Sequence, residues 1–139
     1  MIASIVQRLS SGVSALRTVK STADMALVLG GRLRHALPAA FVHPVRDAAG
    51  EPQTFPAHTQ IVRRQVGVLL LVAAQGADRG AGNHDVLEPI FDAVRSTLAG
   101  WTPSDVDDPL RFVAGEMVRI ADGVAWWLEL FETAEMLRT

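Results

Sequence analysis

Histidine and aspartate side chains are the groups in this sequence that could bind a metal ion. The four histidines are scattered along the chain, at His35, His43, His58 and His84. No two of them have the i, i+4 spacing that brings two imidazoles to one helix face as zinc ligands. The aspartates of residues 105–108 resemble part of a calcium-binding loop, but the glycine and the distal glutamate of such a loop are missing. We therefore expect no metal site and no cofactor.

The sequence also lacks the patterns of nucleophilic enzymes. It contains no cysteine, and no Gly-x-Ser-x-Gly sequence presents a serine nucleophile. Acidic residues that could transfer protons lie on or just after the last predicted strands, without an evident cleft: Glu116, Glu129, Glu132 and Glu135. We expect from this that the protein is not an enzyme.

A glycine-rich segment, residues 76–82, lies between an apolar run and a predicted helix, where a phosphate-binding loop would be found. No Gly-Lys-Ser or Gly-Lys-Thr sequence follows, and a dinucleotide-binding pattern would need glycine where Asp85 stands. An ordinary connection between a strand and a helix is the better interpretation. A nucleotide- or small-ligand-binding α/β module remains the alternative function from a different class.

The composition indicates a protein that associates with copies of itself. Of 139 residues, 49% are apolar, and the mean hydropathy of +0.22 is high for a small monomer. Apolar surface that one subunit cannot bury is expected to contact another subunit. The length fits a single domain spanning residues 1–139.

Charge and hydropathy argue against two kinds of partner. The net charge is −2 and the pI is about 6.0, so no overall field attracts the chain to DNA or to an anionic membrane. No apolar run approaches the roughly 18 residues of a membrane span. Gln7 and Arg8 interrupt the N-terminal apolar segment, so we expect neither a signal peptide nor a membrane anchor.

Residues 59–74 predict the long central strand of a sheet, and the other elements are organised around it. From Val66 onward both faces of this strand are apolar, as expected where a sheet is covered on both sides. In the more polar half, Arg63 and Arg64 alternate to opposite faces. We name both arginines as candidate contacts with a neighbouring subunit.

Shorter elements precede the central strand. The spacing of apolar residues predicts an amphipathic helix over residues 2–16, an edge strand over 17–20 and a short helix over 23–29. A strand over 37–45 contains two prolines, which place it near an edge of the sheet. Residues 47–58 have no periodicity and form a predicted loop, a candidate arm that reaches a neighbour through Gly50, Pro52 and Phe55.

A helix and a hairpin follow the central strand. The helix has its apolar face over residues 86–98; Asn83 or Asp85 is its expected cap, and Pro89 limits how early it begins. An acidic turn over residues 105–109 leads into a hairpin with strands over 110–120 and 124–133, joined by an Asp-Gly turn. These elements predict an α+β fold, a mixed or antiparallel sheet with helices packed on it and a C-terminal β-hairpin.

Two neighbouring tryptophans, Trp126 and Trp127, lie on the last predicted strand. Adjacent residues of a strand point to opposite faces, so one indole can serve the core while the other needs cover from a helix, a loop or a partner. We include both among the candidate contacts between subunits.

The ordered set of these features resembles the small tail terminator proteins of tailed bacteriophages and prophages, including the Mu-prophage-like class. The resemblance covers nearly the whole chain and rests on the order of the features rather than on one signature. They are the amphipathic N-terminal helix, the short helix before Leu37-Pro38-Ala39-Ala40-Phe41-Val42, the strand 66–74, the Arg79-Gly80 turn with Asp85-Val86-Leu87, the segment Ala99-Gly100-Trp101-Thr102-Pro103, and the hairpin with Trp126-Trp127 and Phe131.

This resemblance implies a structural virion protein, assembled in the host cytoplasm and located at the neck end of the tail. Six copies would form a ring that caps the tail tube, ends tube polymerisation and provides the interface to the head-tail connector. The implied partners are the tube protein and the connector or other neck proteins, with the sheath protein as a further candidate. DNA would pass through the ring without specific binding. Another ring-forming neck or head-tail joining protein is the closer alternative.

Overall fold

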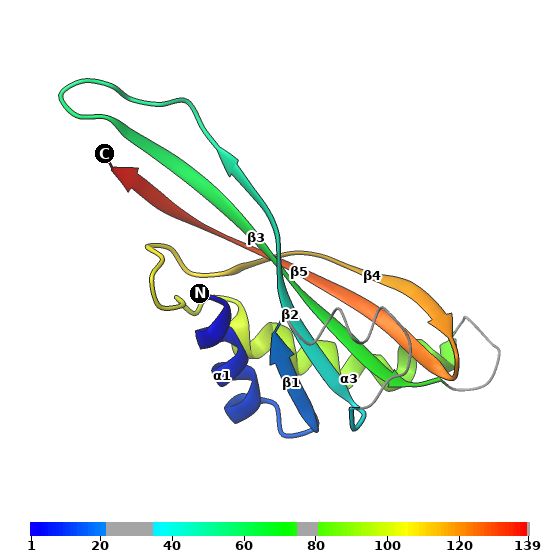
Figure 1. The fold of residues 1–139 in the computed structure, drawn as a ribbon. Coiled ribbons are helices and arrows are strands. Elements are labelled where there is room, and N and C mark those ends of the chain that lie inside the picture. The colour runs from blue at the N-terminus through cyan, green and yellow to red at the C-terminus, as the bar shows by residue number, and fades with distance from the viewer. Residues whose placement is uncertain (22–34, 75–80, 139) are drawn as a thin grey trace.

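Two helices pack on one face of a five-stranded sheet in the computed structural model, which describes residues 1–21, 35–74 and 81–138 (Figure 1). The helices are α1 (Ile2–Gly12) and α3 (Ala81–Leu98). The strands are β1 (Thr18–Ser21), β2 (Ala39–Ala49), β3 (Thr59–Ala73), β4 (Arg111–Ala121) and β5 (Val124–Arg138), in the spatial order β1-β2-β3-β5-β4. β1 is parallel to β2 and the other neighbours are antiparallel, which confirms the predicted α+β fold with a mixed sheet.

β3 is the central strand, as its sequence predicts. It pairs with β2 on one side and, along its whole length, with β5 on the other. Every residue from Val66 to Val72 is buried, whereas the residues from Thr59 to Gln65 are half-buried or exposed. The two halves of β3 therefore have different surroundings, which agrees with the change from a polar to an apolar sequence at Val66.

Alternate side chains of β3 contribute to two separate apolar clusters. On the face covered by the helices, Val66, Val68, Leu70 and Val72 share one cluster with α1 and α3 residues that include Ile5, Leu9, Leu87, Phe91 and Val94. On the opposite face, Leu69 and Leu71 pack with Ala39, Phe41, Val124 and Trp126. Because successive side chains of a strand point to opposite faces, the side chains of β3 contribute alternately to the two apolar clusters.

The first helix is shorter than the sequence predicts. α1 ends at Gly12 rather than at residue 16, although Val13 and Leu16 still pack against the core. A Cβ atom at Gly12 would lie 2.9 Å from the side chain of Thr97, so glycine is required where α1 passes close to α3. The apolar spacing therefore predicted the buried face correctly and the helix end incorrectly.

The helix α3 begins earlier than predicted. α3 starts at Ala81, so Asn83 is a buried residue within the helix rather than its cap, and Pro89 lies inside the helix instead of limiting its start. Proline cannot donate a backbone hydrogen bond, but the apolar face around Leu87 and Phe91 is anchored on the sheet. Packing therefore maintains the helix through Pro89. The predicted short helix 23–29, and residues 76–80 of the glycine-rich segment, lie outside the described residues.

β2 occupies residues 39–49 rather than 37–45, so the predicted loop 47–58 shortens to 50–58. Its first four residues lie between β1 and β3, which corrects the prediction of an edge position there. Beyond Val42 the pairing with β1 ends, and Pro44 and the irregularity after it lie where β2 is paired only with β3. The missing N–H of Pro44 is tolerated because no described strand pairs with its outer side.

The C-terminal hairpin is confirmed at its turn and is longer than predicted. Asp122 and Gly123 adopt φ angles of 53° and 75°, the left-handed conformation that an Asp-Gly hairpin turn requires. β5 continues to Arg138 rather than stopping at residue 133, because it stays paired with the outer half of β3. No helix in the described part of the chain combines the length and apolar character that a membrane span requires.

Candidate assembly surface

The outer half of the sheet forms an arm that projects beyond the two helices (Figure 1). We define the arm as residues 43–65 and 132–138, which comprise the end of β2, the loop 50–58, the first half of β3 and the end of β5. Gln53 and Thr59 pair across the loop, and the amide of Gly50 donates a hydrogen bond of 2.9 Å to the carbonyl of Ile61. The predicted contact residues Gly50, Pro52 and Phe55 are all exposed in this loop.

The arm carries most of the large apolar side chains that the described residues expose. Phe55, in the loop, is 84% exposed. Ile61 and Met136 lie opposite each other on β3 and β5, and are 49% and 40% exposed. Val45 and Leu137 are exposed as well. One exposed apolar residue is ordinary, but several on one projection indicate a surface that binds another protein.

Two arginines lie on the same face of the arm as Ile61 and Met136, which is the face opposite the helices. Arg63 is two residues from Ile61 on β3, and Arg46 on β2 is opposite Gln65; both arginines are exposed. Neither has an ion pair within 4 Å in the described part of the chain. This face of the arm therefore combines apolar side chains with guanidinium groups that a partner could neutralise.

Glu132 lies on the same face and already has a cationic partner. Arg111, at the start of β4, forms an ion pair with Glu132 across the two neighbouring strands. The hydrogen bond from Arg111 lowers the pKa of Glu132, an effect that burial partly opposes. Glu132 is therefore held as a carboxylate, paired within its own chain.

Arg63 and Arg64, which the sequence could not distinguish as candidate contacts, have different surroundings in the structure. Arg64 points to the other face of β3, where its guanidinium is 2.7 Å from the carboxylate of Glu135 and 3.8 Å from that of Asp47. Its partners on β5 and β2 belong to the same chain, whereas Arg63 has no ion pair within 4 Å among the described residues and acts on Glu132 only from a greater distance. A contact with a neighbouring subunit stays a prediction for both residues, and the geometry favours Arg63.

The acidic turn of residues 105–109 lies along the outer edge of β5, just before the first residue of β4. The amide of Asp108 donates to the carbonyl of Ala134 at 3.3 Å, and the hydroxyl of Thr133 donates to the carbonyl of Asp108 at 2.6 Å. The amide of Met136 donates to the carboxylate of Asp107 at 2.9 Å. The turn therefore occupies hydrogen-bonding positions that a further strand would otherwise take.

The two tryptophans point to opposite faces of β5, as predicted. Trp127 stacks on Phe91 of α3, with ring centroids 4.8 Å apart, and so belongs to the helix-covered face. Trp126 belongs to the other apolar cluster, is 4% exposed, and lies under the guanidinium of Arg119. Both indoles are largely covered within the subunit, and their predicted role in subunit contacts stays a prediction.

A buried ion pair joins α3 to β5, and the sequence analysis did not identify it. Glu129 is fully buried; its carboxylate accepts hydrogen bonds of 2.8 and 2.7 Å from Arg95 and one of 2.7 Å from the indole of Trp127. The hydrogen bonds to Glu129 raise the pKa of Arg95, against the opposing effect of burial. Trp127, Glu129 and Phe131 are spaced two residues apart and therefore lie on one face of β5. A single carboxylate between two aromatic residues on that face was the sequence feature that could have indicated a buried ion pair. The pair fixes the position of α3 rather than forming a reactive centre.

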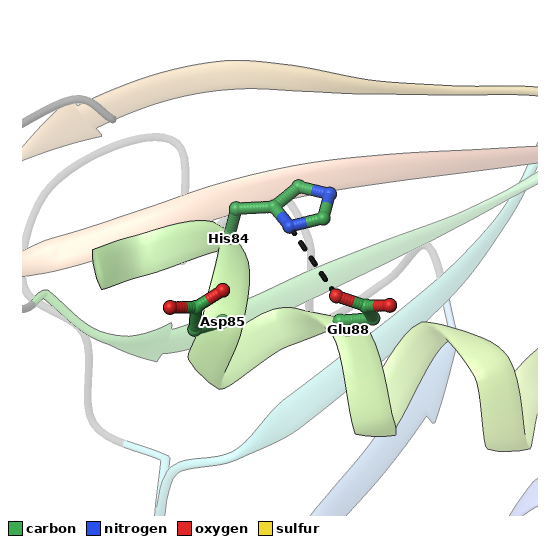
Figure 2. Close-up of side chains that lie close together, drawn as sticks. All are labelled: His84, Asp85 and Glu88. Carbon is green, nitrogen blue, oxygen red and sulfur yellow. Dashed lines mark ion pairs between the residues drawn. The ribbon is translucent and has the colours of Figure 1, made fainter. Parts of the chain in front are cut away.

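His84, Asp85 and Glu88 are the one group of potential metal ligands among the described residues (Figure 2). Their ligand atoms lie within 4.8 Å of one another, and Nδ1 of His84 is 3.6 Å from the carboxylate of Glu88. All three residues are exposed, and the imidazole of His84 packs edge-on against Phe91 and Trp127. Nothing in the described residues beyond this proximity indicates an ion, so we interpret the group as a solvated ion pair at the start of α3.

Comparisons with known proteins give a family and a similar fold. A family model described as "Phage tail terminator protein" matches residues 2–139. A chain in a solved structure entitled "Virion of native gene transfer agent (GTA) particle" is similar with a TM-score of 0.55 and 13% identity, over 95% of this chain and 91% of that chain. At this identity the second likeness shows the fold alone. No curated protein matches the sequence.

Proposed function

The chain belongs to the phage tail terminator family, and from this premise we propose that it forms a ring on the end of a tail tube and stops the tube from growing. In this proposal the exposed side of the ring then provides the surface to which the head-tail connector binds. The family is one of structural tail proteins, so a structural role in the virion tail follows from membership itself. The observation that carries the proposal is the family match over residues 2–139.

The architecture supports assembly into a ring. One subunit covers its sheet with helices on one face and leaves an arm with exposed Phe55, Ile61 and Met136. A surface of this kind, repeated once per copy, can contact a different surface of the next copy, and such head-to-tail contacts close into a ring when the rotation between copies permits. We propose six copies, with the tube protein and the connector as partners. DNA would pass through the lumen without specific binding.

Mass and shape measurements test this proposal. Light scattering over a range of protein concentrations should detect a species of six chains of 15.0 kDa, in solution or after addition of tail tubes. Electron microscopy should then show one ring at the end of each tube. A matched variant, Phe55→Ser, should fold as the parent does and bind tube ends less well, because Phe55 contributes to the exposed arm and to neither apolar cluster of the described residues. A chain that stays monomeric and leaves tube ends bare would contradict the proposal.

A further inference from the structure

The arm has two long edges, and they differ in what they expose. On the β2 edge, residues 43–49 lie beyond the pairing with β1, and no described strand pairs with their outer side. This edge carries Val45, which is 44% exposed, and Arg46, which has no ion pair within the described residues. Its acidic residue, Asp47, points to the other face of the sheet and lies 3.8 Å from Arg64 of the same chain. An uncovered strand edge with an apolar and a basic side chain is suited to contact with another chain.

The opposite edge of the arm is acidic. The turn that lies along β5 contains Asp105, Asp107 and Asp108, all exposed. The carboxylate of Asp107 accepts a hydrogen bond from Met136, while those of Asp105 and Asp108 have no ion pair within the described residues. The amide of Asp108 donates to the carbonyl of Ala134, and the hydroxyl of Thr133 donates to the carbonyl of Asp108; both hydrogen bonds hold the turn in place. The backbone of Asp108 is therefore held beside β5, and its carboxylate is presented from there.

We propose that copies of this chain associate side by side through their arms, with the β2 edge of one copy against the acidic turn of the next. The occupant of the β2 edge is thus a second copy of this chain. Arg46 of one copy would face Asp108 of its neighbour, and Val45 would contact the apolar side chains near the turn, Met136 and Leu137. The inference rests on the proposed ring and specifies the surface that builds it.

Charge complementarity is the reason for choosing this occupant. Arg46 and the acidic turn lie on opposite edges of the same sheet, separated by the strands β3 and β5. One chain cannot bring its own two edges together, because the paired strands between them are fixed in register. Two copies can, and since the surfaces differ the contact is head-to-tail and repeats around a ring. Opposite charges also oppose wrong registers, in which like charges would meet.

Charge reversal tests the contact directly. Arg46→Glu and Asp108→Arg each place like charges across the proposed contact, so each variant alone should self-associate at least about tenfold more weakly than the parent. An equimolar mixture of the two variants should recover the parent's association, because every contact in an alternating assembly then joins opposite charges. Sedimentation velocity at several concentrations measures all three samples. Arg17→Glu is the matched control, since Arg17 is exposed, has no ion pair among the described residues and lies outside the arm.

Every outcome bears on the inference. Weak association of both single variants with recovery in the mixture supports it. Variants that associate as the parent does, single variants that are weakened but show no recovery on mixing, or a parent that is monomeric at all concentrations and on tube ends would overturn it. Tube-capping activity of the same samples separates this inference from the proposed function. A parent that associates through this contact without affecting tubes contradicts only the function, and variants that assemble and cap normally contradict only the contact.

Discussion

The guanidinium of Arg95 on α3 forms two hydrogen bonds with the fully buried carboxylate of Glu129 on β5, 34 residues away in sequence. The aromatic rings of Phe91 and Phe112 lie 4.3 and 4.1 Å from the same guanidinium. A cation held between two rings and a buried carboxylate has few alternative positions, so the pair sets the register between α3 and the hairpin. It stabilises the body of the subunit from which the arm projects.

Arg95→Met should strongly destabilise the fold. The substitution keeps much of the aliphatic length but leaves the Glu129 carboxylate buried without its cation, which costs about 3–5 kcal/mol. The double variant Arg95→Met/Glu129→Gln should lose less than the sum of the two single variants, because no unpaired charge remains. Urea unfolding followed by circular dichroism gives all three values. Additive losses would show that the two side chains act independently and would refute the coupling.

Gly115→Ala should destabilise the same region by about 1–3 kcal/mol, as overpacking does. A Cβ atom at Gly115 would lie 2.5 Å from Oε1 of Glu129 and 2.8 Å from Nη2 of Arg95, so the ion pair would have to shift. Gly50→Ala is the matched control, since its Cβ would meet only the carbonyl oxygen of Ile61 at an ordinary 3.6 Å. In thermal unfolding, Gly115→Ala should have a lower midpoint temperature than the parent, and Gly50→Ala should have the same midpoint as the parent. Equal midpoints for the two variants would contradict the close packing at Gly115.

Arg63→Glu and Arg64→Glu should now have different effects, although the sequence could not distinguish them. Arg64→Glu replaces a cation 2.7 Å from Glu135 with an anion, so it should reduce the stability of the monomer. Arg63→Glu changes an exposed residue that forms no ion pair within 4 Å in the described part of the chain and acts on Glu132 only at longer range, so it should alter monomer stability by under about 0.5 kcal/mol and weaken assembly. Chemical denaturation and light scattering measure the two properties separately. If both variants assemble and cap tubes like the parent, neither arginine contacts a neighbour.

The stability of the subunit should decline below neutral pH in part because of His43. Burial lowers the pKa of His43 below its ordinary value of 6.5, so the unfolded chain binds a proton at a pH where the folded chain does not. The free energy of unfolding is therefore unaffected by His43 above about pH 6.5, and falls as the pH decreases from that value toward the folded pKa. NMR titration of the imidazole should give a midpoint below 6.5. A midpoint at or above 6.5 would disprove this contribution.

The sequence predicted the elements whose patterns are local. The continuous apolar run after Val66 predicted the buried half of the central strand, and the Asp-Gly pair at residues 122 and 123 predicted the hairpin turn. The ends of elements were predicted less well, because they depend on distant contacts. Pro89 remains within a helix because the helix is packed on the sheet, and β5 continues past residue 133 because β3 lies beside it.

The candidate surface required the three-dimensional structure for a similar reason. The sequence placed an arm at residues 47–58 but could not show that β2, β3 and β5 extend into it together. Arg64 and Glu135 are 71 positions apart, and only the strand register brings them together. The same register leaves Arg63 without an ion pair among the described residues and places Ile61 beside Met136. The sequence named the candidate contact residues as one group, whereas the structure shows where in the sheet or in the loop 50–58 each of them lies.

The most direct measurement of the central claim is the length of tail tubes grown in the presence of this protein. Purified tube protein should be allowed to polymerise with increasing amounts of the chain, and tube lengths should be measured by electron microscopy. We predict tubes that become shorter as the chain is added, stop growing, and carry one ring at the closed end. Tubes that reach the same length with or without the chain, and that carry no ring, would contradict the account.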